Sequence, residues 1–166
     1  MSHVWSRSWF RLGAASLLVG ALFLTVPARA QDGPRITLDV AWRLIDAAQK
    51  EAASKDLRLS FAVVDARGDL VALARMPGAG AGTPDTAIGK AMLSAMHGAP
   101  SAALVQRSTS PVTQSINEAS GGRLRFFQGA LPIVKDGFQI GSIAASGATS
   151  QQDEDAVRVA LALLAP

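Results

Sequence analysis

Two hairpin signatures, far apart in the chain, restrict its fold more than any other feature. The first joins the apolar runs Ser60–Asp65 and Leu70–Arg75 through a short turn that contains a glycine. The second joins Leu131–Lys135 to Phe138–Ser146 through Asp136-Gly137, a dipeptide that favours a type I′ turn. Neither strand of the first hairpin alternates cleanly between apolar and polar residues. We therefore expect helices or a partner subunit to cover both faces of the sheet.

Helical patterns flank and separate these hairpins. Thr37 is positioned to cap a first helix with one apolar stripe, and Ser150, with Asp153 at the capping-box position, is expected to start the last helix. The order helix, hairpin, helices, hairpin, helix predicts a single α+β domain, in which a central antiparallel sheet has helices packed around it. We expect the helices at about residues 38–55, 85–96, 102–107, 112–119 and 150–164.

The first thirty residues, 1–30, have the pattern of a secretory signal peptide of the bacterial Sec type. Basic residues precede an apolar run, Leu12–Val26, and Ala28-Arg29-Ala30 fits the cleavage pattern. The run is shorter than the roughly 17–25 residues of a membrane-spanning helix, although a retained anchor is the alternative. We expect removal of residues 1–30, a mature domain over 31–166 with no membrane span, and a periplasmic or secreted location.

The charge balance supports no nucleic-acid partner. The chain has 16 Lys and Arg, 13 Asp and Glu, and a formal net charge of +3. Arg7, Arg11 and Arg29 all lie in the leader, which has no acidic residue, so the mature domain is formally neutral apart from its single histidine. The absence of cysteine excludes disulfides, thiolate metal sites and a cysteine nucleophile.

The glycine-rich stretch Met76–Pro84 is not a nucleotide-binding loop. A Walker motif ending at Gly89-Lys90 would need a glycine at Pro84 and a hydroxyl at Ala91. The stretch leads into a predicted helix. Backbone N–H groups at Gly80 and Gly82 are therefore candidates for binding a carboxylate or another anion, and the alternative is an ordinary mobile connection.

His97 is the only histidine after the leader, and it follows Met92 and Met96 at the end of a predicted helix. An imidazole at this position is a candidate haem iron ligand; the alternative is a histidine that caps helix carbonyls. The methionines suit core packing better than ligation. Lys90 and Arg75 are candidates to pair with ligand carboxylates, or are solvated charges.

Two further clusters allow two interpretations each. Phe126 and Phe127, flanked by Arg123 and Arg125, either stack on a flat ligand or take part in packing and subunit contact. The acidic run 153–155 resembles a metal cluster, but its place in the first turn of the last helix favours an interaction with the helix dipole.

The order of these motifs resembles the GlcG/HbpS-like haem-binding family, which is also described as a haem-degrading domain. The resemblance is carried by residues 61–73, 75–76, 87–91, 129–137 and 141–147, and by Asp153. It covers about residues 36–164, and it implies an α/β/α layered, profilin-like fold, symmetric homo-oligomers, and haem binding in some members. The family usually has Gly-Gly before Leu-Pro, whereas Gly129 is followed here by Ala130.

The leading hypothesis is therefore an exported haem- or tetrapyrrole-binding protein linked to haem degradation or sensing. In it, Arg75 and Lys90 engage the propionates, His97 ligates the iron, and Phe126 or Phe127 contacts the macrocycle. The alternative is an enzyme or accessory protein for a small organic acid or aromatic compound. It would use the glycine-rich turn and Lys90 or Arg75 as the anion clamp, with Asp65 or Asp85 as general base. A third hypothesis is a structural oligomer. Whether the protein is an enzyme stays open.

Overall fold

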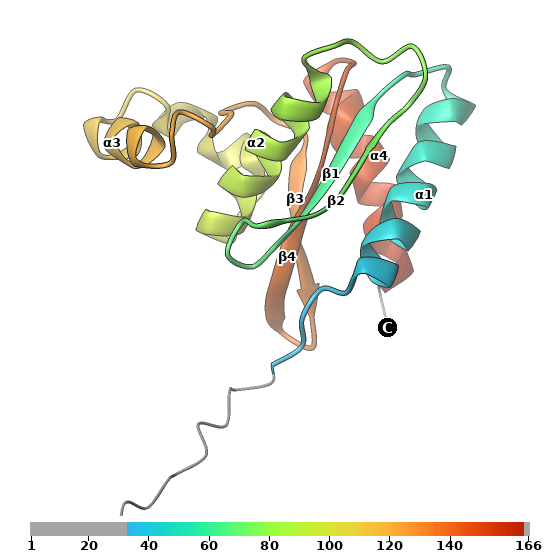
Figure 1. Ribbon diagram of the computed structural model, residues 1–166, viewed down its shortest axis with the longest axis horizontal. Helices are drawn as coiled ribbons and strands as arrows, with labels where there is room; N and C mark the ends of the chain where they lie inside the picture. The colour runs from blue at the N-terminus through green and yellow to red at the C-terminus, as the bar shows by residue number, and fades with distance from the viewer. Residues whose placement is uncertain (1–32, 165–166) are drawn as a thin grey trace, which may run out of the picture. The chain divides into compact units, whose positions relative to one another are not determined.

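The computed structural model describes residues 33–164 (Figure 1). The predicted signal peptide lies outside the described residues, and it stays a prediction. Among the helices of the described part, none is both long and apolar enough to cross a membrane. The elements along the chain are α1 (Leu38–Ser54), β1 (Ser60–Asp65), β2 (Leu70–Arg75), α2 (Thr83–His97), the 3-10 helix η1 (Ser101–Arg107), α3 (Pro111–Ala119), β3 (Ala130–Lys135), β4 (Phe138–Ser146), α4 (Ser150–Leu161) and the 3-10 helix η2 (Ala162–Leu164).

The four strands form one antiparallel sheet in the order β2-β1-β4-β3. Its two central strands pair along their length, with Asp65 at the end of β1 opposite Gly141 near the start of β4. Both hairpin turns therefore lie at the same end of the sheet. Asp136 and Gly137 have φ values of 52° and 78°, the positive values that a type I′ turn requires, so the second hairpin is confirmed.

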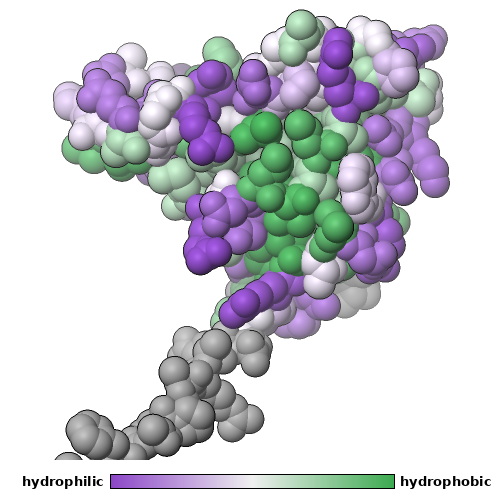
Figure 2. Space-filling model, viewed as in Figure 1, coloured by the Kyte–Doolittle hydropathy of each residue, from purple (hydrophilic) through white to green (hydrophobic). Residues whose placement is uncertain are grey.

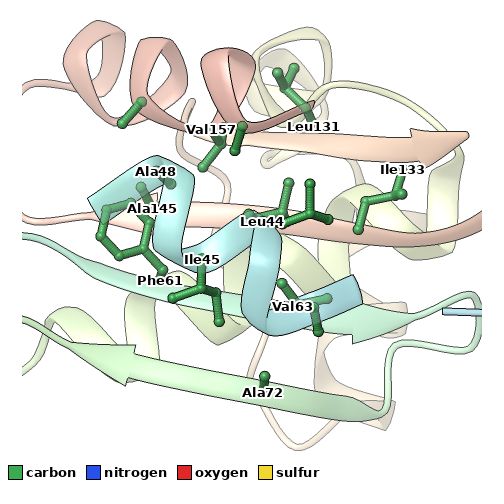
Figure 3. Close-up of a cluster of buried hydrophobic side chains, with 14 of the residues drawn as sticks. Leu44, Ile45, Ala48, Phe61, Val63, Ala72, Leu131, Ile133, Ala145 and Val157 are labelled. Atoms are coloured by element: carbon green, nitrogen blue, oxygen red, sulfur yellow. The ribbon is translucent and has the colours of Figure 1, made fainter. Parts of the chain in front are cut away.

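Helices cover both faces of the sheet and make three layers (Figure 1). α1 and α4 lie side by side on one face, where Leu44, Ile45 and Val157 pack against Phe61 and Val63 (Figure 3). α2 covers the other face, where its small residues pack against Ala62 and Val64 of β1. Because both sets of β1 side chains are fully buried, the strand has no reason to alternate between apolar and polar residues. The predicted α+β architecture is confirmed.

The helix caps agree with the sequence prediction at α1 and differ from it at α4. The Thr37 hydroxyl accepts a hydrogen bond from the Val40 N–H at 3.3 Å, as expected. At α4 the cap is Thr149, which forms a capping box with Gln152. The prediction of Ser150 and Asp153 for these positions was wrong. The Asp153 carboxylate is instead engaged by Lys90 and by the N–H of Ala148.

The segment between α2 and β3 extends from the layered core and then returns across α2 (Figure 1). It contains η1 and α3, both close to their predicted positions, followed by a loop over residues 120–129. The loop meets α2 where the Arg125 N–H donates to the Gly89 carbonyl at 3.2 Å. This contact brings Arg123, Arg125 and Phe126 beside α2.

Candidate functional site

His97 occupies the last position of α2, and the helix ends at Gly98 in a left-handed conformation. Its half-buried ring has Nδ1 3.1 Å from the Leu93 carbonyl oxygen. A carbonyl only accepts hydrogen bonds, so in the neutral ring Nδ1 carries the proton and Nε2 keeps its lone pair. The backbone of α2 thus holds the imidazole in the tautomer that a metal ion can bind through Nε2.

The two methionines near His97 have different surroundings. Met92 is 8% exposed and belongs to the core between α2 and the sheet, as predicted. Met96 is 45% exposed beside His97, and for this residue the prediction of a core position was wrong. At the C-terminal end of α2, the Met96 side chain is therefore exposed and the His97 ring is partly exposed.

Lys90 lies in the interior, with only 2% of its side chain exposed. Its ammonium donates to Asp153 Oδ2 at 2.8 Å and to the Ala145 carbonyl at 3.1 Å. A Cβ at Gly129 would stand 2.8 Å from Nζ, so this glycine leaves the space through which the lysine passes. The carboxylate that Lys90 holds in the structure is thus one of the protein's own.

Arg75 and the glycine-rich turn form one local unit before α2. The Arg75 guanidinium donates to the Ala79 carbonyl from both Nε, at 3.0 Å, and Nη2. The Thr83 hydroxyl donates to the Gly80 carbonyl at 2.7 Å, and Gly82 is the N-cap residue of α2. These bonds close the turn at the N-terminal end of the helix, and anion binding by its N–H groups stays a prediction.

The two adjacent phenylalanines differ in how far they are buried. Phe126 is partly buried and packs on the α2 side of the sheet, whereas Phe127 is 55% exposed. The arginines beside them line a crevice of about 180 Å³, together with Asp85 and Ile88 of α2. Sequence reasoning had named these arginines only as neighbours of the phenylalanines.

A second crevice, of about 350 Å³, lies at the hairpin end of the sheet. Arg35 and Arg67 contribute to its lining, and Val71 and Ile140 contribute apolar surface. Asp65 also lines it, but its Oδ1 already accepts from the N–H groups of Arg67 and Asp69 at 2.8 and 3.0 Å. This carboxylate stabilises the β1–β2 turn.

The residues proposed from the sequence do not gather around one pocket. Arg75, Gly80 and Gly82 lie at the start of α2, and His97 lies at its end. A rise of 1.5 Å per residue places these ends about 20 Å apart. Lys90 lies between them, inside the protein. A single flat ligand that contacts His97 would not reach the glycine-rich turn.

Sequence reasoning missed the role of Gly89. A Cβ at this position would collide with the Arg123 carbonyl oxygen and come within 2.5 Å of Arg125 Cγ. The signal was a glycine in the interior of a helix, a position that normally costs stability and therefore has a packing reason. Within residues 33–164, no three His, Cys, Asp or Glu side chains are placed to hold a metal ion together.

Comparison with known proteins gives one consistent family. A family model described as haem-degrading protein HbpS-like matches residues 36–162. A Citrobacter freundii protein, described as an uncharacterized 15.0 kDa protein of the dhaT–dhaS intergenic region, is 25% identical over 80% of this chain and 94% of its own. The crystal structure of HbpS is 26% identical, covers 83% of this chain and 96% of its own, and has a TM-score of 0.72. The structure of a PduOC–haem complex is 24% identical over 78% of this chain and 94% of its own, with a TM-score of 0.69.

Proposed function

We propose that this chain, which belongs to the HbpS-like family of haem-degrading proteins, binds haem or a related tetrapyrrole and uses His97 as an iron ligand. The observation that carries the proposal is the anchored imidazole at the end of α2, whose Nε2 is left to bind a metal. The family description and the haem complex of the structurally similar PduOC support haem as the ligand.

His97 meets one requirement that haem has of a protein, which is a ligand for its iron. Haem supplies an iron that already has four porphyrin nitrogens, so one protein nitrogen completes a five-coordinate centre. His97 offers that nitrogen, and the bond from Nδ1 to the Leu93 carbonyl fixes the ring orientation.

The test is a haemin titration followed through the Soret band, on protein purified after expression of the complete chain. We expect saturable binding, and a shifted Soret maximum with at least about tenfold weaker binding in His97→Ala. Added imidazole should restore the spectrum of this variant. Met96→Ala is the matched control on the same turn of the helix and should keep an iron–histidine spectrum.

Two results would contradict the proposal in different ways. An unchanged spectrum and affinity in His97→Ala would remove His97 from the site and leave haem binding in place. The absence of any saturable Soret change in the wild-type protein would end the haem proposal itself. His3 is the only other histidine of the chain, so a His3→Ala variant controls for it where the leader is retained.

We also propose that the protein is exported through its leader and acts in the periplasm or outside the cell. The support is the sequence pattern of residues 1–30, with its basic start, apolar run and Ala28-Arg29-Ala30 site. N-terminal sequencing of the protein recovered from a secreting host should give Gln31 as the first residue. Recovery of the intact chain from the cytoplasm would contradict export.

We further infer a homo-oligomer that uses β2 as an interface. β2 is an edge of the sheet, and Figure 2 shows a broad apolar area over the β1–β2 hairpin between α1 and α2. Leu70, at the start of β2, is 48% exposed. Antiparallel pairing of two β2 strands around a two-fold axis at Ala72 would set Asp69 opposite Arg75 of the second copy. Two copies of this strand would thus pair opposite charges at both ends and apolar residues between them.

A further inference from the structure

We propose that the crevice between α2 and the loop 120–129, here called the Arg123–Arg125 crevice, is a binding site for a carboxylate anion. Arg123 and Arg125 line it on the loop side, and Asp85 and Ile88 line it on the α2 side. The inference rests on these residues and does not depend on iron binding by His97.

The backbone that carries the two arginines is fixed to its surroundings. The Leu124 N–H donates to Asn117 Oδ1 at 2.9 Å, and the Gly122 N–H donates to the Asn117 carbonyl at 2.7 Å. Leu124 itself is buried, at 2% exposed. Arg123 and Arg125 directly precede and follow this anchored residue, so their backbone is already fixed. A ligand that binds them restricts only the two side chains, which lowers the entropy cost of binding.

Gly89 allows this loop to lie directly on α2. Any larger residue would place a Cβ where the Arg123 carbonyl oxygen stands, next to the side chain of Arg125. A glycine inside a helix costs roughly 0.5–1 kcal/mol relative to alanine. The close contact between loop and helix, which sets the position of both arginines, depends on this residue.

The charges in the crevice are not balanced by the protein. Neither Arg123 nor Arg125 forms a salt bridge with any carboxylate in residues 33–164, and Asp85 is the one acidic residue in the lining. Arg125 Nη1 donates to the Gly122 carbonyl at 2.8 Å and to the Leu124 carbonyl at 3.2 Å, which orients this guanidinium and leaves Nε and Nη2 available. With two arginines and one aspartate in the lining, the crevice has a formal charge of +1, which favours a bound anion.

The shape of the crevice indicates the kind of anion. A guanidinium presents parallel N–H groups that match the two oxygens of a carboxylate. A volume of about 180 Å³ accommodates a carboxylate with a small body, but not a whole macrocycle. Ile88 gives the body an apolar wall. The carboxylate can belong to a small organic acid or to the propionate of a tetrapyrrole, and the chemistry at the arginines is the same.

The experiment measures benzoate and succinate binding by calorimetry at low salt, on protein expressed from the complete chain. The variants are Arg123→Gln, whose side chain makes no hydrogen bond within residues 33–164, and the Arg123→Gln/Arg125→Gln double variant. Arg107→Gln, an exposed arginine of η1, is the matched control. We expect at least about tenfold weaker binding in both crevice variants and no change in the control.

A second arm compares haemin with its dimethyl ester, which has no free propionate. If haemin binds more tightly than the ester and the Arg123→Gln variant removes that difference, the carboxylate comes from the tetrapyrrole. If only the small acids bind at the arginines, they are the source, even where haemin fails to bind at all. The proposal is overturned if neither small-acid affinity nor the haemin–ester difference changes in the Arg123→Gln variant.

Discussion

Lys90 connects the two helical layers of the protein. It starts on α2, on one face of the sheet, and its ammonium meets Asp153 of α4, which packs on the other face. The pair is almost fully enclosed and is bonded further to the Ala145 carbonyl and the Ala148 N–H. A buried ion pair of this kind contributes little net energy when intact, but losing one partner leaves a charge without compensation.

The Lys90→Met variant is therefore expected to lose about 3–5 kcal/mol of unfolding free energy, because Asp153 stays buried without its cation. Urea denaturation followed by circular dichroism measures the loss. The Lys90→Met/Asp153→Leu double variant should lose less than the sum of its single variants. Lys50→Met, at an exposed position of α1, is the control, and it should stay within about 0.5 kcal/mol of the wild type. Wild-type stability in Lys90→Met would show that the pair is dispensable.

Single-residue roles were the part of the structure least accessible from the sequence. Lys90 and Asp153 are 63 positions apart, and no local pattern links them. The acidic run was correctly placed at the start of α4, yet the sequence could not reveal that Asp153 faces a lysine instead of solvent. Gly129 and Gly89 likewise depend on which distant atoms approach them. His97 was proposed as a ligand because it is the only histidine after residue 30, and that role stays a prediction.

Helices and strands were predicted well because their signals are local. Turn dipeptides, helix caps and apolar periodicity act within a few residues, so the two hairpins and the order of the elements could be read directly. The α4 cap shows the limit of such signals. Thr149 and Ser150 are adjacent hydroxyl residues that both precede a suitable capping-box partner, and the choice between them depends on the tertiary engagement of Asp153.

The capping box of α4 can be tested with two neighbouring substitutions. Thr149→Ala removes the acceptor for the Gln152 N–H and should cost about 1 kcal/mol of unfolding free energy. Ser150→Ala replaces an exposed first-turn residue and should change it by less than about 0.5 kcal/mol. Urea midpoints compare the two variants directly. A larger loss in Ser150→Ala would mean that the helix begins one residue later.

At the scale of the whole molecule, β2 and β3 are the two edge strands of the sheet, and they differ in how their outer edges are protected. The Met76 N–H donates to the Leu59 carbonyl, towards β1. Because backbone groups alternate along a strand, the N–H and C=O groups of residues 73 and 75 point away from β1. An apolar edge without proline is prone to pair with another strand unless a partner covers it. On the opposite edge, β3 contains Pro132, and the Ala130 N–H is already bonded to Ser101. The two edges therefore differ, and β2 is the one suited to assembly.

Assembly through β2 predicts that Leu70→Lys dissociates the oligomer. Lysine at an exposed edge position must lose its hydration when a second strand pairs there, and this cost opposes the interface. Light scattering after size exclusion should show an oligomer for the wild type and a monomer for the variant. Val112→Lys, at a 70% exposed position of α3, should leave the oligomer intact. A monomeric wild type, or an unchanged oligomer in Leu70→Lys, would contradict this interface.

The position of Asp153 has a consequence for how the chain is completed. Synthesis runs from the N-terminus, so α2 and its ammonium emerge well before the helix that carries the matching carboxylate. Until α4 is synthesised, the Lys90 ammonium would have to be buried in the apolar core without a counter-ion. This cost disfavours packing of α2 against the sheet. α4 is therefore needed to complete the packing of the domain. A chain truncated before residue 153 should not fold stably and should be cleaved readily by proteases, even if its earlier helices and hairpins form.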